Sequence, residues 1–339
     1  MSVWRWPFDI IPSQQVWRLI SRAATAPSPL SAFSQTVSRT GPFWACELAF
    51  QNLDGMQRER LISFLNQVGD QSDVFYLPDL ASAQTASALQ PDNIVANGNF
   101  LTLTSWSKTD ANLDIAGGWG RVVNTHATNL GRIYQQLTFS STARYTLSGN
   151  LKLTGANVKV MLGTTVGGSE VTSLTVTTSG AFNFPFDAPG GATLYLTLEN
   201  QGTTVGNTFW VSNVACEPGL RVDADAIDGN IVRVTGHNHH GTASQDRALG
   251  VGEMVAFQYA NYKFELKRLT VDHASDLTAG AEGYLLFEPP MRNALAANNT
   301  AWLGTNAGAR MRLAGPGYDR ADVPGIFTDI NVSCIEAFE

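Results

Sequence analysis

A strand–helix–strand unit near the N-terminus most constrains how this chain can fold. Residues 43–50 are almost entirely apolar, which fits a largely buried strand. Asp54 is a good helix N-cap, and Gln57 three residues later completes a capping box. The pattern predicts a helix over 56–68 and a second strand over 73–78 that ends at its proline. The unit contains no catalytic pair, metal-ligand spacing or phosphate-binding loop.

Length and composition exclude several classes of protein. The chain has 339 residues, which suggests two or three domains, and its 44% hydrophobic content is enough for real cores. The net charge is −7 and no basic stripe is present, so nucleic acid is not an expected partner. The first residues lack the apolar core of a signal peptide, and no apolar run is long enough to span a membrane. We therefore expect a soluble chain without an export signal of its own.

Three widely separated cysteines indicate a reducing environment during folding. Cys46, Cys216 and Cys334 each lie in an apolar, strand-like run. An odd number of distant cysteines favours buried free thiols over one disulfide with a leftover thiol. That interpretation suits assembly in a reducing compartment.

The composition changes sharply in the middle of the chain. Residues 92–218 contain 20 threonines in 127 residues, whereas the other 212 residues contain 11. Within this segment short alternating runs are bounded by Gly, Asn or Ser, which is typical of a β-sandwich. The small and polar residues 79–92 look like a linker into it. The composition of 219–339 returns to that of the first 91 residues, so the middle segment is interpreted as an insertion.

The flanking segments are also expected to be mainly β. Strands are predicted from the alternation of 221–234 and 253–269, and from the runs 284–292, 309–313 and 326–338. Near the N-terminus, a first strand is expected from the alternation of Trp4, Trp6, Phe8 and Ile10, and a second over 16–20. The tryptophans in this region either fill the core or pack on a neighbouring subunit, since aromatic residues concentrate in interface cores.

The insertion resembles a jelly-roll carbohydrate-binding module. The resemblance covers nearly all of it and rests on the following stretches: Asn93-Ile94-Val95-Ala96-Asn97-Gly98-Asn99-Phe100, Trp106, Tyr134-Gln135-Gln136-Leu137, Tyr145-Thr146-Leu147-Ser148 and Phe209-Trp210-Val211-Ser212-Asn213-Val214. Such modules close with a strand ending in Asp-Asn-Val. Ser212 replaces that Asp here, which puts the structural calcium of such a strand in doubt.

The whole chain resembles distal tail, or baseplate, proteins of long-tailed bacteriophages. The resemblance rests on the joint order of several stretches: residues 44–50 with the following helix, Val74-Phe75-Tyr76-Leu77-Pro78, Phe287-Glu288-Pro289-Pro290-Met291-Arg292, Gly325-Ile326-Phe327-Thr328-Asp329-Ile330 and Ile335-Glu336-Ala337-Phe338. It implies one baseplate domain formed by 1–91 and 219–339 and interrupted by 92–218. It also implies a ring, typically a hexamer, made in the host cytoplasm and located at the virion tail tip, where it contacts the tail tube and the baseplate hub.

Aromatic residues of the insertion are the candidate carbohydrate-binding residues, because a flat apolar ring suits the face of a pyranose. Tyr195 lies between two leucines and should face outward if they face inward. Tyr134 shares a face with Gln136, although Gln135 on the opposite face leaves this assignment open. Trp119 lies in a glycine-rich segment and is expected to be accessible. Trp106, by contrast, is interpreted as core.

No catalytic or metal site is predicted. His237, His239 and His240 form a cluster, but no carboxylate or cysteine stands at a suitable spacing, so a solvated loop is the favoured interpretation. Gly-x-Ser-x-Gly does not occur, and no motif indicates the two converging carboxylates of a glycosidase. The chain is therefore expected to be neither an enzyme nor dependent on a cofactor.

These observations predict a mainly β protein, namely a β-sandwich baseplate domain with one α-helix, interrupted by a jelly-roll sandwich. The expected function is a structural ring in a phage tail tip, with an outward module that contacts polysaccharide on the host surface. Two alternatives remain open. A receptor-binding protein at the tail tip would carry fibrous repeats or a coiled coil, and a freestanding carbohydrate-binding protein would carry a signal peptide.

Overall fold

The computed structural model describes residues 3–337 apart from 8, 22, 28–33, 39–40, 70–72, 81–92, 140–142, 223–228, 236–250, 261–262, 272–282, 304–306, 316–318 and 324–326. Most of the predicted linker 79–92 lies outside the described residues. The protein is mainly β, with one helix, α1 (Gly55–Val68), among the described residues, which confirms the predicted fold class. In this part of the chain no helix is long and apolar enough to cross a membrane.

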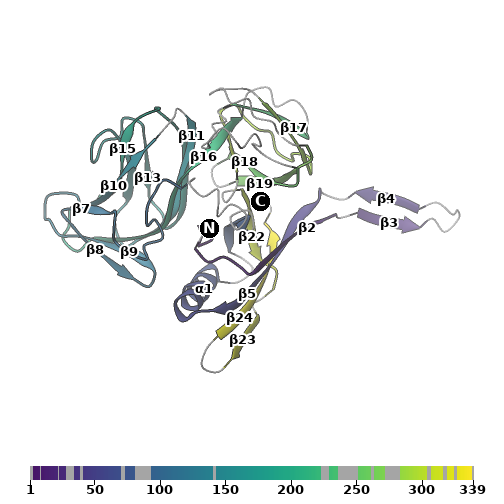
Figure 1. Ribbon diagram of the computed structural model, residues 1–339, viewed down its shortest axis with the longest axis horizontal. Coiled ribbons are helices and arrows are strands. Elements are labelled where there is room, and N and C mark those ends of the chain that lie inside the picture. The colour runs from purple at the N-terminus through teal and green to yellow at the C-terminus, as the bar shows by residue number, and fades with distance from the viewer. Residues whose placement is uncertain are drawn as a thin grey trace.

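The strands of the described residues form four sheets, and Figure 1 shows how they are arranged. The first has seven strands in the order β1-β6-β22-β24-β5-β2, with β23 beside β24: β1 (Val3–Arg5), β2 (Gln14–Ile20), β5 (Phe43–Leu53), β6 (Val74–Pro78), β22 (Gly308–Leu313), β23 (Asp319–Val323) and β24 (Phe327–Glu336). The second has five strands in the order β13-β12-β15-β10-β7: β7 (Ser107–Thr109), β10 (Arg132–Thr138), β12 (Val158–Gly163), β13 (Thr172–Val176) and β15 (Thr193–Asn200).

The third sheet runs without a break from the threonine-rich segment into the C-terminal segment. Its ten strands are β8 (Ala111–Ala116), β9 (Trp119–Asn124), β11 (Ala143–Leu153), β14 (Gly180–Ala188), β16 (Thr208–Val222), β17 (Ile231–Thr235), β18 (Met254–Ala260), β19 (Lys263–Leu269), β20 (Gly283–Glu288) and β21 (Thr300–Trp302). The fourth sheet is the hairpin of β3 (Ala23–Pro27) and β4 (Ser34–Ser38). Figure 1 shows this hairpin extending away from the rest of the molecule.

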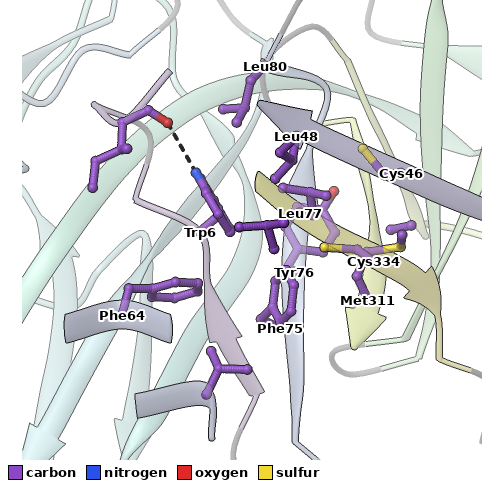
Figure 2. Packing of buried hydrophobic residues seen from close by; sticks show 14 of the residues in the cluster. Trp6, Cys46, Leu48, Phe64, Phe75, Tyr76, Leu77, Leu80, Met311 and Cys334 are labelled. Carbon is purple, nitrogen blue, oxygen red and sulfur yellow. Dashed lines mark hydrogen bonds between the residues drawn. The ribbon is translucent and has the colours of Figure 1, made fainter. Parts of the chain in front are cut away.

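The predicted strand–helix–strand unit forms as β5, α1 and β6. Asp54 caps the helix, because its Oδ1 accepts a hydrogen bond from the backbone N of Gln57 at 2.7 Å. The expected first strand is shorter than its alternation suggests: β1 ends at Arg5, two residues before Pro7, which has no N–H to donate to a sheet. Trp6 follows it and is fully buried, with its ring 5.1 Å from that of Phe64 (Figure 2).

Both flanking segments supply strands to the seven-stranded sheet. Strands β1, β2, β5 and β6 come from the N-terminal segment, whereas β22, β23 and β24 come from the C-terminal one. One hydrophobic cluster joins them and also includes side chains of α1, β18 and β19. Trp4 and Trp6 belong to this cluster, and Trp17 packs against it with its ring 6.2 Å from that of Trp44. The tryptophans near the N-terminus therefore pack on this core.

The threonine-rich segment forms a sandwich. The five-stranded sheet faces β14, β11, β16, β9 and β8 across a separate hydrophobic cluster. Trp106 is buried there and stacks on Phe100 at 5.1 Å, as expected of a core residue. The two ends of this segment lie side by side, since Ile94 N donates to Cys216 O at 3.1 Å and Cys216 N donates to Asn93 Oδ1 at 3.0 Å.

Strand β16 leaves the sandwich and enters a closed barrel, which the sequence analysis did not find. Its last residues pair with both β17 and β21, and the circuit β16-β17-β20-β19-β18-β21 returns to β16. A third hydrophobic cluster, including Val222, Phe257 and Phe287, fills this barrel. Because β16 is shared, continuous sheet joins the sandwich to the barrel.

A buried arginine ties the sandwich to the seven-stranded sheet. Arg5 in β1 donates from its backbone N to Asn150 Oδ1 at 2.9 Å, and Asn150 Nδ2 donates back to Arg5 O at 3.1 Å. The guanidinium contacts Ser148 and lies 3.2 Å from Glu217 Oε2. Arg5 and Glu217 are 3% and 7% exposed, so this ion pair is shielded from water. Breaking such a pair leaves an uncompensated charge, which opposes separation of the two parts.

Candidate carbohydrate-binding face

The outer face of the five-stranded sheet carries two of the three predicted carbohydrate-binding residues. Leu194 and Leu196 of β15 are fully buried, and Tyr195 between them is half-buried on the opposite face. Tyr134 alternates in the same way with buried Ile133 and Gln135 in β10. The period of two in an extended strand explains both orientations.

The register of β10 and β15 brings the two tyrosines together. Gln136 pairs with Tyr195 and Tyr134 pairs with Thr197, which makes the tyrosines diagonal neighbours. Their ring centroids lie 6.5 Å apart at an interplanar angle of 65°. The face therefore offers two tilted aromatic rings that are each partly accessible to solvent.

Gln135 is buried for a specific reason. Its Oε1 accepts a hydrogen bond from Ala96 N at 2.7 Å, and its Nε2 donates to Ala96 O at 2.8 Å and to Ser105 O at 3.2 Å. The amide is thus satisfied by backbone groups, which removes the cost of burying it. This resolves the assignment of Tyr134 to the outer face.

Charged and polar groups border the tyrosine pair. Arg132 lies two residues before Tyr134, and its Nε is 3.5 Å from Glu199 Oε2. Gln201 Nε2 donates to the other carboxylate oxygen of Glu199 at 3.0 Å. Lys159 of β12 stands directly opposite Glu199 in the register. These groups place hydrogen-bond donors and an acceptor beside the aromatic rings.

Residues 164–170 form a loop that folds against the same face. Gly167 N donates to Thr197 Oγ1 at 3.0 Å, and Thr197 is fully buried although it faces outward. Gly167 has a φ of 80°, and a Cβ at this position would lie 2.6 Å from Nη1 of Arg132. A side chain at this position would be strained and would displace the guanidinium of Arg132, which explains why the loop has a glycine here.

Trp119 lies elsewhere and does not contribute to this face. It belongs to β9 in the opposite sheet of the sandwich and is half-buried, not freely accessible as expected. Its ring packs edge-to-face on Trp4 at 6.2 Å, and Lys152 Nζ lies 4.5 Å from its centroid. Burial lowers the pKa of Lys152. Trp119 therefore packs at the junction between the sandwich and the seven-stranded sheet.

The two glycines before Trp119 allow the chain to pack closely at this same junction. Gly117 and Gly118 have φ values of 61° and 76°, a backbone region that glycine adopts without strain. A Cβ on Gly118 would lie 2.9 Å from Nε of Arg60 in α1. The run that suggested an accessible tryptophan is thus explained by close approach of this loop to the helix.

Sequence reasoning missed Arg132, Glu199 and the loop 164–170. Their grouping depends on strand pairing across positions that are far apart in the chain, and no local motif marks it. A signal was present in Gly167-Gly168, a turn dipeptide after a strand, but it does not reveal which face the loop covers.

Among the described residues, no group of His, Cys, Asp and Glu could hold a metal ion. His237, His239 and His240 lie outside the described residues. Ser212, which stands where the resembled modules carry Asp, is buried in β16 and pairs with Asn150 in the register.

Comparisons with known proteins give a similarity limited to part of the chain. No protein-family model matches it, and no curated protein matches it. A solved carbohydrate-binding module of family 4 matches with 14% identity and a TM-score of 0.30, over 37% of this chain and 99% of that chain. The enzymatically active domain of tailspike protein 4 of bacteriophage CBA120 matches with the same identity, TM-score and share of this chain, over 21% of that chain.

A third solved structure, TmCBM61 in complex with β-1,4-galactotriose, matches with 13% identity and a TM-score of 0.29, over 37% of this chain and 98% of that chain.

Proposed function

We propose that this chain is a glycan-binding structural protein of a phage tail tip. In this proposal the sandwich binds polysaccharide on the host surface through Tyr134 and Tyr195, and the flanking segments assemble into a ring. The observation that carries the binding role is the pair of tilted, partly accessible tyrosine rings with the Arg132–Glu199 pair beside them.

The chemistry of the face suits a saccharide. A pyranose has an apolar face that packs on an aromatic ring, and its hydroxyl groups require donors and acceptors at the edge of that ring. Arg132 and Lys159 supply donors, while Gln136, which is exposed, supplies both donor and acceptor. Two rings form a small contact, so a single copy should bind with a Kd of roughly micromolar to millimolar.

Binding without hydrolysis is part of the proposal. Glycosidases place two free carboxyl groups on either side of the scissile bond. Near the tyrosine pair, Glu199 is engaged by Arg132 and Gln201, and Glu170 Oε2 accepts a hydrogen bond from Thr164 N at 3.1 Å. Both carboxylates thus have local partners that favour a structural role for them.

Self-assembly is supported by two features of the N-terminal segment. Strand β2 is an edge of the seven-stranded sheet and exposes Leu19 and Ile20, which are 42% and 39% accessible. An apolar edge strand is a natural site for pairing with another chain. The extended hairpin β3–β4 continues from this edge (Figure 1), and an isolated two-stranded hairpin is only marginally stable in water. We propose other copies of the chain, the tail tube and the baseplate hub as the partners that cover these surfaces.

Assembly would compensate for weak binding by each copy. A ring that presents several sites to one polysaccharide gains avidity of ~100-fold or more when the glycan spans the sites. A monomeric chain that binds glycan equally well would instead favour a freestanding carbohydrate-binding protein.

A glycan array probed with the full chain tests the binding role. Tyr134→Ala and Tyr195→Ala should each weaken binding about tenfold, because each removes one stacking ring. Tyr284→Ala is the matched control, since Tyr284 is 49% exposed on the barrel strand β20, and it should leave binding unchanged. Absence of binding to any glycan, or full binding by both sandwich variants, would contradict this site.

Light scattering tests the assembly role separately. The full chain should form an oligomer, and deletion of residues 23–38, which removes the hairpin, should reduce it to smaller species. A strict monomer at high concentration that binds no tail component would count against the ring.

A further inference from the structure

Two of the three cysteines are direct partners across neighbouring strands. Cys46 of β5 pairs with Cys334 of β24 in antiparallel register. The pairs on either side, Glu47 with Ser333 and Ala45 with Ile335, keep the same register, so no bulge separates the two cysteines. Direct partners in an antiparallel pair point their side chains to the same face. Figure 2 shows both residues in the same core.

This pairing fits the reach of a disulfide bond. Directly opposed residues have Cα atoms about 4.5 or 5.5 Å apart, depending on the type of pair, and disulfides bridge Cα separations of about 4.4–6.8 Å. Cys216 has no such partner, because it lies in the sandwich core opposite Leu147. All three cysteines are free and buried, as the sequence predicts.

We infer that Cys46 and Cys334 form a latent disulfide site, reduced while the chain folds in a reducing compartment and closed when it meets a low-molecular-weight disulfide. The inference does not depend on carbohydrate binding. It adds a covalent link between the N-terminal and C-terminal segments that build the seven-stranded sheet.

The exchange is balanced with oxidised glutathione as the oxidant. The thiolate of one cysteine attacks a glutathione sulfur, which forms a mixed disulfide and releases one glutathione thiolate that takes up the proton. The second cysteine thiolate then attacks the protein sulfur of the mixed disulfide and releases the second glutathione. The protein loses two electrons and two protons, and one oxidised glutathione becomes two reduced molecules.

Burial makes the closure slow in the folded protein. Cys46 and Cys334 are each 1% exposed, and burial raises the pKa of the Cys46 thiol to about 12. Few thiolates therefore form until the strands open. Strand β2 covers this position, because Cys46 pairs with Trp17 of β2 on one side of β5 and with Cys334 of β24 on the other. Since β2 is an edge strand, its opening is a local route to the thiol.

Refolding in redox buffers tests the inference with the full chain. The protein is unfolded in urea with reductant and refolded in reduced or oxidised glutathione. Peptide mapping without reduction should then find a Cys46–Cys334 link only after refolding in oxidised glutathione. Circular dichroism should be the same for both samples, and the oxidised one should melt at least ~5 °C higher, because the link closes a very long loop.

Variants separate this pair from non-specific oxidation. Cys216→Ser should keep both the link and the difference in melting temperature, whereas Cys334→Ser should lose both. Three free thiols in natively folded protein from the oxidised buffer would overturn the inference. So would a link that involves Cys216, or a Cys46–Cys334 link that forms only with loss of the native spectrum. The results that would overturn the inference are all measured on the unmodified chain, so they can be obtained even if a variant does not fold.

Discussion

Replacement of Lys267 by methionine should be among the most destabilising changes in the flanking segments. Lys267 is fully buried, and its Nζ donates to Glu265 Oε2 at 2.7 Å and to Pro290 O at 2.8 Å. Glu265 is 1% exposed and also accepts hydrogen bonds from the backbone N of Arg292 at 2.9 Å and of Asn293 at 2.8 Å. The pair thus links β19 to the chain that follows β20.

The magnitude follows from what each variant leaves behind. Lys267→Met removes both charge-assisted hydrogen bonds of Nζ, to Glu265 and to the carbonyl of Pro290, each worth ~1.5–3 kcal/mol. It also removes the buried ammonium, whose desolvation cost offsets part of this loss. Glu265 keeps the donors of Arg292 and Asn293, so the loss should be about 2–3 kcal/mol. Glu265→Gln places an NH₂ group among donors and leaves the Lys267 ammonium buried without its counter-ion. That variant should lose about 3–5 kcal/mol, as when one partner of a buried pair is removed.

Urea unfolding at pH 7, followed by tryptophan fluorescence, measures these losses. Lys263→Met is the control, because Lys263 begins the same strand in a half-buried position, and it should change stability by less than ~0.5 kcal/mol. The double variant Glu265→Gln/Lys267→Met should lose at least ~1.5 kcal/mol less than the sum of the single variants. Strict additivity, or a loss below ~1 kcal/mol for Lys267→Met, would refute the reasoning.

Three further predictions concern other parts of the chain. Burial raises the pKa of Glu336, whereas Lys267 and neighbouring donors outweigh the effect of burial on Glu265 and lower its pKa. Glu336→Gln should therefore lower the free energy of unfolding in urea at pH 7 by less than Glu265→Gln does. The stability difference between Glu265→Gln and the unmodified chain should shrink below about pH 4.5, because protonation of Glu265 removes its stabilising effect. Replacement of residues 92–218 by a short linker should leave a folded protein by circular dichroism, because the two ends of the sandwich are adjacent. This protein should be less stable than the full chain, because Arg5 loses partners in the sandwich. If the product is unfolded and the isolated insert is also unfolded, these boundaries are wrong. Trp119→Ala should lower the melting temperature and leave glycan binding unchanged, and a selective loss of binding would return this residue to the carbohydrate site.

Local sequence patterns predicted the elements well where the physics is local. The cap at Asp54, the period-two alternation around Tyr195 and the apolar runs around the cysteines depend on neighbours within a few residues. Such neighbours act whatever the tertiary arrangement is. The same patterns did not reveal that Trp119 is half-buried, because glycines that are typical of exposed turns also permit close packing, here against Arg60.

The amino-acid sequence by itself determined a mainly β chain with one capped helix, a threonine-rich segment of short strands, and the outward direction of Tyr195. Only the tertiary structure decided that Tyr134 meets Tyr195, that β16 closes a barrel, and that Cys46 faces Cys334. Each of these depends on the register between strands distant in the chain. Periodicity within a strand fixes which face a side chain takes, but pairing between strands fixes its neighbour across the sheet.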